Sequence, residues 1–369
     1  MHRNQGPVYY GDYLKLSELL GSQEPLSLKY GSECHDETLF IIVHQVYELW
    51  FKQILHELKS INSVFAKPWV NEEELSVVIS RTNRITKIQQ LLIDQLPVME
   101  TMTPMDFLEF RDLLIPASGF QSAQFREIEI MMGLNTNSRA RVDREYFLGR
   151  LNTADRTRLE TIEKEPSLLH NIEQWLERIP FTTSAGFNFW EAYEKAVEEM
   201  LQTEEEIIQK NQATLTPMAL EAGLENLKTT RETFKSLLDP ERHQKLVQEG
   251  KRKLSQKATL NALFILLFRD KPLLHIPYLF LTSLMDIDEN FTSWRYRHAM
   301  MAHRMLGTKI GTGGSSGHQY LKMAAENNRV FIDLFNLSTF LIPRSKLPQL
   351  PEELLKTMDF FFNQQKRYY

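Results

Sequence analysis

The amino-acid sequence predicts an all-α fold, a bundle of many helices. Apolar residues recur at three- and four-residue spacing along most of the 369 residues, and the alternation of apolar and polar residues that marks a strand is scarce. Hydrophobic residues make up 42% of the chain and charged residues 25%, so a large core and a solvated surface can both form. We therefore expect roughly ten or more helices in a single domain over residues 1–369.

The first long helix is predicted near Glu37 to Ser60, because two apolar stripes run along it. The first stripe comprises Phe40, His44, Tyr47, Phe51, Leu55 and Leu58. The second comprises Leu39, Val43, Val46, Trp50 and Ile54. A helix that is apolar on two sides is buried. A second helix, near Glu72 to Leu96, has one apolar stripe between polar residues, which is typical of ordinary bundle packing.

A short helix is predicted from Thr103 to about Leu114. Thr103 is a capping residue, Pro104 follows at the first helical position, and Asp106 supplies an acid at the third. Pro116 ends this helix. Residues 133–155 are polar and arginine-rich, which indicates a surface connection.

Residues 186–250 are strongly charged, and we interpret them as a helical excursion with a solvated face, a small subdomain within the single domain. An apolar helical pattern resumes from Leu254 to Phe268, and Pro272 and Pro277 are expected to break it. A further helix then carries His298. The last apolar segment, residues 329–340, is stopped by a proline.

Composition excludes several kinds of partner and site. The net charge of -5, from 43 basic and 48 acidic residues, gives no positive field for nucleic acid or an anionic membrane. The single cysteine, Cys34, excludes an internal disulfide, a multi-cysteine zinc site and covalent attachment of haem through a CxxCH motif. The first residues lack an apolar run and no apolar run reaches membrane-spanning length, so we expect a cytoplasmic protein.

The segment around His298 indicates a haem site. Trp294, His298, Met301 and Met305 fall on one helical face, so the imidazole would project from an apolar, polarizable surface. One histidine can give haem iron an axial nitrogen and leave the opposite position free for dioxygen. The alternative is a histidine satisfied within the core. His303 lies five residues further on, which is wrong for the i, i+4 pair of a helical zinc site.

Two residue pairs at i, i+4 spacing could face a ligand. Phe40 and His44 would present an aromatic ring beside an imidazole, and the alternative is simple core packing. Phe107 and Arg111 would place a guanidinium beside an aromatic ring, where it could grip a carboxylate through two hydrogen bonds. The alternative for Arg111 is a surface arginine paired with an acid.

Two further segments stay open on residue types alone. The loop Gly311 to Gly317 lacks the Gly-Lys-Ser/Thr ending of a phosphate-binding loop, and it is either a flexible linker or a segment whose Thr312 closes over a ligand. Tyr9, Tyr10 and Tyr13 are either surface tyrosines or an aromatic arm laid over a pocket.

Taken together, these segments closely resemble the tryptophan 2,3-dioxygenase family along almost the whole chain. The motifs that carry the resemblance are YGDYL from Tyr10, Asp36-Glu37 with LFIIVHQVYELWFKQ from Leu39, DFLEFR from Asp106, PASGFQS from Pro116, WRYRH from Trp294, GTGGSSG from Gly311 and DLFNLSTFLIP from Asp333. So many long motifs in the right order make coincidence negligible.

The resemblance implies a haem b, non-covalent and one per subunit, with dioxygen as co-substrate. His298 would be the axial ligand of the iron, Trp294 would pack beside it, and Arg126 would meet a haem propionate. Ser118 and Gly119 would line the distal pocket close to the bound dioxygen.

The resemblance also implies a substrate site for L-tryptophan. His44 would lie near the indole nitrogen, Arg111 would take the carboxylate, and the family is a homotetramer whose N-terminal segment reaches a neighbouring pocket. The implied substrate-binding residues are Phe40, Ile41, Ile42, Val43, His44, Phe107, Arg111 and Thr312, with Tyr10, Tyr13 and Leu14 from the neighbour.

The activity implied by the family inserts both atoms of O2 across the indole C2–C3 bond of L-tryptophan. The product is N-formyl-L-kynurenine, and the reaction begins tryptophan degradation by the kynurenine pathway. A related haem monooxygenase acting on a substituted tryptophan is one rival, but it would be expected to alter His44, Arg111 or Thr312, and none is altered. A non-catalytic haem sensor is the other, and it would be expected to carry an output domain.

Overall fold

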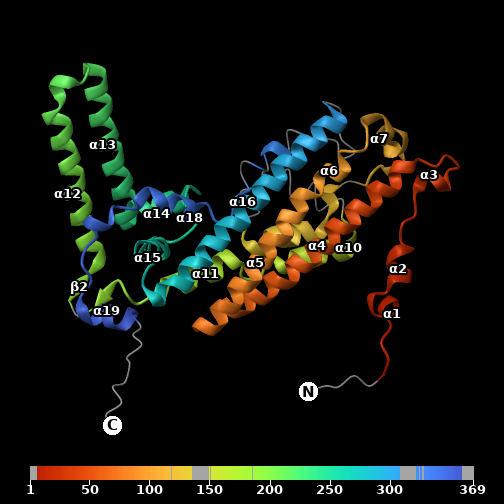
Figure 1. The fold of residues 1–369 in the computed structure, drawn as a ribbon, viewed down its shortest axis with the longest axis horizontal. Helices are drawn as coiled ribbons and strands as arrows, with labels where there is room; N and C mark the ends of the chain where they lie inside the picture. The colour runs from red at the N-terminus through yellow and green to blue at the C-terminus, as the bar shows by residue number, and fades with distance from the viewer. Residues whose placement is uncertain are drawn as a thin grey trace, which may run out of the picture. The chain divides into compact units, whose positions relative to one another are not determined.

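The computed structural model describes residues 6–117, 119–134, 149, 151–184, 186–307, 321–323, 325 and 328–359. Within these residues the chain is helical almost throughout (Figure 1). The pair of strands found there, β1 (Thr183–Ser184) and β2 (Phe187–Asn188), forms a short antiparallel hairpin in which Thr183 lies opposite Asn188. The predicted all-α fold is therefore confirmed.

The chain divides into two compact units, and three long helices contribute residues to both. The first unit comprises residues 1–58, 85–165 and 289–329, and the second comprises residues 59–84, 166–288 and 330–369. The shared helices are α4 (His35–Phe65), α5 (Glu72–Asp94) and α16 (Pro272–Leu306). We describe each unit by itself.

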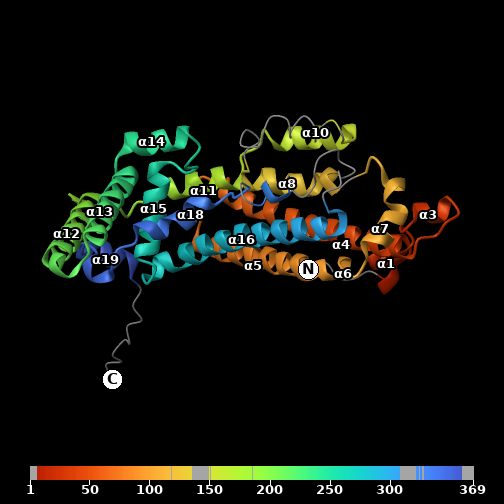
Figure 2. The ribbon, with the colours of Figure 1, turned by 90° about the horizontal axis from the view of Figure 1, so that it is seen from above.

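The other helices of the first unit are short. They are α1 (Tyr10–Leu14), α2 (Leu16–Leu20), α3 (Leu26–Lys29), α6 (Leu96–Met99), α7 (Pro104–Arg111), the 3₁₀ turns η1 (Asp112–Leu114) and η2 (Gly119–Gln121), α8 (Ala123–Met132) and α10 (Thr153–Ile162). Helices α8 and α10 lie side by side, as Figure 2 shows. Most of the predicted surface connection between them, residues 135–148, lies outside the described residues.

Helix α4 is the predicted first long helix, and its apolar stripe enters the core. Tyr47 and Phe51 are buried in the first unit, and the Tyr47 hydroxyl donates a hydrogen bond of 2.7 Å to the Leu92 carbonyl of α5. At the start of α4 the buried Glu37 carboxylate accepts hydrogen bonds from the backbone N–H groups of Leu26 and Ser27, at 2.8 and 2.9 Å. These bonds satisfy two N–H groups that open α3 and fix that short helix to α4.

The capping motif predicted before α7 forms as expected. The Asp106 backbone N–H donates to the Thr103 hydroxyl at 3.2 Å, and the Thr103 N–H donates to the Asp106 carboxylate at 3.1 Å. Pro104 lies in the first turn, where its missing N–H costs no helical bond. The helix ends at Arg111 and continues as η1 to Leu114, so the predicted end is confirmed.

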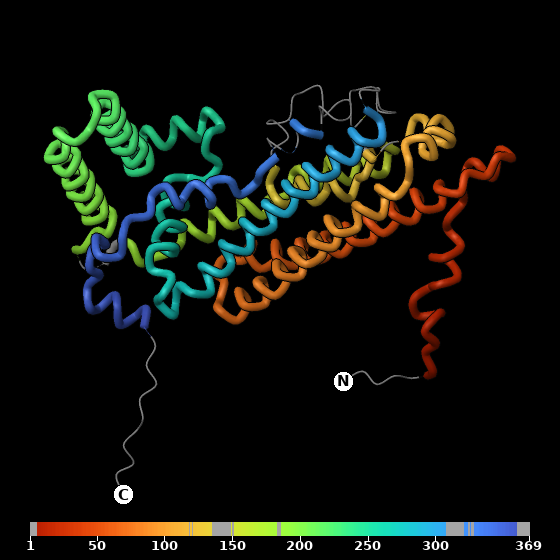
Figure 3. Tube along the Cα trace, turned by 45° about the horizontal axis from the view of Figure 1, so that its top comes forward, coloured from red at the N-terminus to blue at the C-terminus, as the bar shows by residue number. Residues whose placement is uncertain are grey.

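The second unit contains the charged excursion and a buried centre. Its other elements are α11 (Leu168–Glu177), α12 (Phe189–Lys210), the turn η3 (Gln212–Thr214), α13 (Pro217–Leu238), α14 (Pro240–Gln248), α15 (Gln256–Leu267), α18 (Ile332–Asn336), the turns η4 (Leu337–Phe340) and η5 (Arg344–Lys346), and α19 (Glu352–Met358). Helices α12 and α13 run antiparallel as a pair (Figure 3). Arg231 of α13 forms ion pairs with Glu198 and Glu205 of α12.

The predicted break at Pro277 is wrong. Helix α16 begins at Pro272 and continues through Pro277 to Leu306. Pro277 is the sixth residue of the helix, so its ring disturbs only the first turn and removes a single backbone hydrogen bond. Packing of the long remainder offsets this local loss, since Phe280, Leu281 and Leu284 are fully buried.

Candidate functional site

An aromatic group lies on one side of His298 in the first unit. The Trp294 ring, one turn earlier on α16, stacks on the imidazole with ring centroids 5.2 Å apart and planes inclined by 17°. Phe125 of α8 lies 5.1 Å from Trp294, and Tyr47 and Phe51 of α4 lie 6.0 and 6.2 Å from it. Three helices therefore hold Trp294 in place, and Trp294 in turn fixes the plane of the imidazole.

The His298 imidazole is neutral near pH 7. Desolvation by burial is the main cause that lowers its pKa to about 4, and the charge of His44 lowers it further. The two imidazoles thus lie within electrostatic range of each other. Among the described residues the His298 ring has no hydrogen-bond partner, so its nitrogen lone pair is available.

His44 lies in a second aromatic group, built by α4 and α7. The rings of Phe40 and His44 are 4.2 Å apart, and Phe107 stacks on Phe40 at 5.7 Å. Phe110 meets Phe40 and Phe107 edge-on, at 5.6 and 5.5 Å. The structure therefore brings together both predicted i, i+4 pairs, and it adds Phe110, which is fully buried.

The tautomer of neutral His44 is fixed by its own helix. Its Nδ1 lies 2.7 Å from the Phe40 carbonyl oxygen, which can only accept a hydrogen bond, so Nδ1 carries the proton. Solvent reaches one side of the ring in the single chain, but protein packed on the other sides desolvates it and lowers its pKa. The Phe40 carbonyl and the charge of Glu48 raise the pKa by less. Nε2 is thus a hydrogen-bond acceptor near pH 7.

Only some of the other predicted pocket residues lie within the described part of the chain. Arg111 is partly buried in the last turn of α7, one turn after Phe107. Gly119 begins η2, and apart from its chain neighbours no atom of the described residues lies within 4 Å of the position where a Cβ would stand. Ser118 and Thr312 lie outside the described residues.

The residues between Phe40 and His44 face in different directions. Val43 is buried and Ile41 is partly buried, whereas Ile42 is 43% exposed. Two residues of an α-helix turn through about 200°, so the Ile42 side chain points away from the face that carries Phe40.

The N-terminal helix α1 buries none of its residues in the single chain. Tyr10 and Tyr13 are 75% and 76% exposed, and Leu14 is 41% exposed. Leu14 is followed by Lys15, whose backbone is in the left-handed conformation (φ 53°) and separates α1 from α2. The structure of one chain thus leaves this apolar helix uncovered.

Arg126 belongs to a buried cluster that the sequence did not reveal. Its guanidinium donates to Glu129 at 2.8 Å, and the other oxygen of Glu129 accepts from Arg295 at 2.8 Å. Sequence reasoning named Arg126 alone. Arg295 stands inside the WRYRH motif, and its position one residue after Trp294 was the only indication of a role; nothing in the spacing pointed to Glu129.

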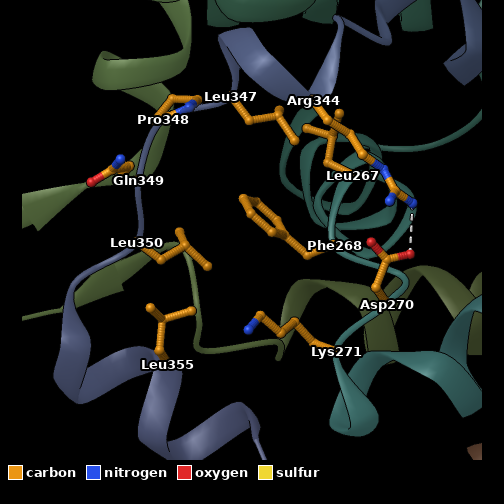
Figure 4. Close-up of a pocket in the computed structure, with 10 residues that line it drawn as sticks. All are labelled: Leu267, Phe268, Asp270, Lys271, Arg344, Leu347, Pro348, Gln349, Leu350 and Leu355. Carbon is orange, nitrogen blue, oxygen red and sulfur yellow. Dashed lines mark hydrogen bonds and ion pairs between the residues drawn. The ribbon is translucent and has the colours of Figure 1, made fainter.

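A separate pocket of about 330 Å³ lies wholly within the second unit (Figure 4). Its floor is apolar, with Phe268 at the centre, and Lys271 and the Asp270–Arg344 ion pair stand at its side. None of the predicted site residues lines it. The pocket is therefore distinct from the histidine site.

The residues of the first unit fit a haem held by one histidine. A neutral, desolvated imidazole without a hydrogen bond among the described residues is a suitable axial nitrogen. The aromatic rings around Trp294 supply the apolar surroundings that a porphyrin face requires. No group of three or more His, Cys, Asp or Glu side chains in the described ranges is arranged to hold a bare metal ion. In the same part of the chain, no helix is long and apolar enough to cross a membrane.

Comparison with known proteins identifies the family of this chain. The sequence model of the family described as tryptophan 2,3-dioxygenase matches residues 1–341. Proteins named tryptophan 2,3-dioxygenase from Alteromonas mediterranea and Bdellovibrio bacteriovorus are 47% and 48% identical, over 98% and 96% of this chain and 99% of each relative. A third, from Dictyostelium discoideum, is 46% identical over 96% of this chain and 89% of its own length. The chain belongs to the tryptophan 2,3-dioxygenase family.

Proposed function

We propose that this protein is a haem-dependent dioxygenase that converts L-tryptophan and O2 into N-formyl-L-kynurenine, the first step of tryptophan degradation by the kynurenine pathway. The observation that carries the proposal is the pair of aromatic groups in the first unit, one that stacks Trp294 on His298 and one that places Phe40 and Phe107 beside His44. Family membership supports the same reaction.

The cofactor is a non-covalent haem b, one per subunit, with His298 as its axial ligand. Cys34 is the chain's one cysteine and lies far from the histidine in sequence, so no thioether attachment is available at His298. Trp294 stacks on the ligand and orients it, and Arg126 would meet a propionate. When bound, the haem supplies the activation of dioxygen.

The substrate lies between the two aromatic groups. Phe40 and Phe107 wall the indole, and the Nε2 atom of His44 accepts the hydrogen bond of the indole N–H. Arg111 grips the carboxylate with its planar fork. The remaining proposed contacts are Ile41 and Val43 of the same turn, Ser118 and Gly119 beside the dioxygen, and Thr312 at the amino-acid end, whereas Ile42 points away from the face that carries Phe40.

The contribution of these residues is placement rather than acid–base chemistry. The lowered pKa makes His44 a weak base, which suits an acceptor that orients the ring and leaves its proton in place. A charged fork at one end of the substrate and an acceptor at the other hold a flat apolar molecule in register.

The working form is a homotetramer in which α1 of one subunit reaches a neighbour's pocket with Tyr10, Tyr13 and Leu14. The support is the uncovered apolar surface of α1. A cytoplasmic location stays a prediction from the sequence, and the single, buried thiol of Cys34 suits a reducing compartment.

The decisive experiment supplies the haem-loaded, reduced protein with L-tryptophan under ¹⁸O-labelled dioxygen and identifies the product by mass spectrometry. N-formylkynurenine carrying two labelled atoms is the expected result. A single labelled atom would assign the haem monooxygenase rival instead. Sound haem spectra with no product would refute turnover of tryptophan and favour the sensor.

A further inference from the structure

Three charged side chains form a buried group inside the first unit. Arg126, Glu129 and Arg295 are 7%, 3% and 6% exposed, and Glu129 bridges the two arginines with one carboxylate oxygen for each, both at 2.8 Å. Two of these residues lie on α8 and the third on α16. The Glu129–Arg295 ion pair therefore ties α8 to α16 at a depth where solvent screens it little.

Arg295 uses both terminal nitrogens of its guanidinium. Nη2 donates to Glu129 and Nη1 donates to the Asn328 carbonyl oxygen at 2.8 Å, while the planar group lies 5.7 Å from the ring centroids of both Phe125 and Phe291. A lysine offers a single ammonium and could not make these contacts together. The geometry thus requires arginine at this position.

The anchored turn is the one that carries the histidine. Arg295 directly follows Trp294 and precedes His298 by three residues on the same helix. Phe125, which lies against the Arg295 guanidinium, also lies 5.1 Å from the Trp294 ring. A shift of Arg295 would therefore move both the stacking ring and the imidazole.

We propose that Glu129 and Arg295 are positioning residues: their buried ion pair sets the orientation of the α16 turn that presents Trp294 and His298. The inference rests on the proposed function, since it concerns how His298 is held toward a haem. Residues that orient a metal ligand typically affect metal affinity or activity by about 10- to 100-fold when they are replaced.

The same helix offers a matched control. Glu127 of α8 is fully buried and forms an ion pair with Arg158 of α10. Arg158→Gln removes the charged partner of the buried Glu127 carboxylate, and Glu129→Gln removes the charged partner of Arg126 and Arg295. Arg158→Gln, however, leaves the contacts of Arg295 intact. Both changes should lower thermal stability.

The test compares wild type, Glu129→Gln, Arg295→Lys and Arg158→Gln after haem loading. It measures the rate of haem transfer to an excess of apo-globin, the iron–histidine vibration of the ferrous form, and thermal unfolding. We expect haem to leave about tenfold faster or more from the first two variants, with a shifted vibration, and to leave Arg158→Gln at the wild-type rate. Arg295→Lys keeps the buried charge and provides the test should Glu129→Gln fail to fold.

Two outcomes separate this inference from the proposed function. If the rate of haem loss depends only on thermal stability, Arg158→Gln and Arg295→Lys will lose haem equally fast at equal stability. That result would overturn the positioning role and leave the proposed function standing. A wild-type protein that retains no haem would overturn the proposed function first.

Discussion

One residue type serves two purposes in this site, because the surroundings of each histidine differ. The His44 ring is held by the Phe40 carbonyl, which fixes its proton on Nδ1 and leaves Nε2 to accept. The His298 ring has only the stacked face of Trp294 beside it among the described residues, and burial keeps it neutral. Neutrality suits both proposed roles, one imidazole as an acceptor for the substrate and the other as a ligand for iron.

Arg111 and His298 should separate substrate binding from haem binding. Arg111→Ala removes charge-assisted hydrogen bonds to the carboxylate, and it should raise the KM for tryptophan by about 10- to 100-fold with an unchanged Soret band. His298→Ala removes the axial nitrogen, and it should lose the Soret band of the purified protein. An unchanged KM in the first variant, or an unaltered Soret band in the second, would contradict the assigned role.

At this scale the sequence identified residues but not their partners. The i, i+4 spacing of Phe40 with His44 and of Phe107 with Arg111 was visible, because helical periodicity depends on local spacing alone. The bridge from Glu129 to Arg295 joins residues that are 166 positions apart. No local pattern encodes such a pair, so it emerged only with the fold.

At the scale of elements, local chemistry set the beginnings of helices and burial decided their continuation. The Thr103–Asp106 capping box and Pro104 predicted the start of α7 because all their bonds lie within four residues. Pro277 misled the prediction because the loss of one backbone bond is small beside the burial of a helix of 35 residues.

Helix α14 should make the second unit sensitive to acid through His243. Arg252 donates to Nδ1 of this buried ring at 2.7 Å, so Nε2 carries the proton and donates to the Leu254 carbonyl at 3.0 Å. Desolvation chiefly lowers its pKa, and the charge of Arg252 adds to this. The unfolded chain therefore binds a proton below about pH 6.5 that the folded chain resists.

The contribution of neutral His243 to the free energy of unfolding is fully present above the pKa that this group has in the unfolded chain. It is lost as the pH falls below that pKa. Wild type should lose up to about 1 kcal/mol of unfolding free energy between pH 6.5 and 5.5 through this group, and His243→Gln should not show this part of the loss. Urea unfolding at the two pH values measures it. His275→Gln is the control, since His275 is exposed on α16. Equal pH dependence in wild type and both variants would rule out the assigned contribution.

At the scale of the whole molecule, the first helix presents apolar surface that its own chain does not cover. Tyr10 and Tyr13 expose three quarters of their surface, and α1 contains no buried residue. An apolar helix of this kind gains free energy when another surface covers it, about 25 cal/mol for each Å² removed from water. We therefore expect subunits to associate through α1.

Hybrid assemblies can show whether α1 acts on its own pocket or on a neighbour's. A chain with Arg111→Ala has a defective pocket and an intact α1. A chain with Tyr13→Ser has an intact pocket and a defective α1. Co-expressed with separate affinity tags and purified through both, the two chains should form hybrids in which the intact pocket of one receives the intact α1 of the other. Such hybrids should recover part of the wild-type kcat/KM, although each variant alone is impaired.

Recovery depends on the arm crossing the interface, because an arm that served its own chain would leave every hybrid pocket with one defect. Met218→Ser on α13, where the side chain is 83% exposed, is the control in place of Tyr13→Ser. In hybrids of the Met218→Ser chain with the Arg111→Ala chain, half of the pockets should be intact, since only Arg111→Ala impairs a pocket. Light scattering of the Tyr13→Ser chain alone should in addition show partial dissociation of the tetramer. Hybrids no more active than the average of the two parent variants would contradict the exchange of α1 between subunits.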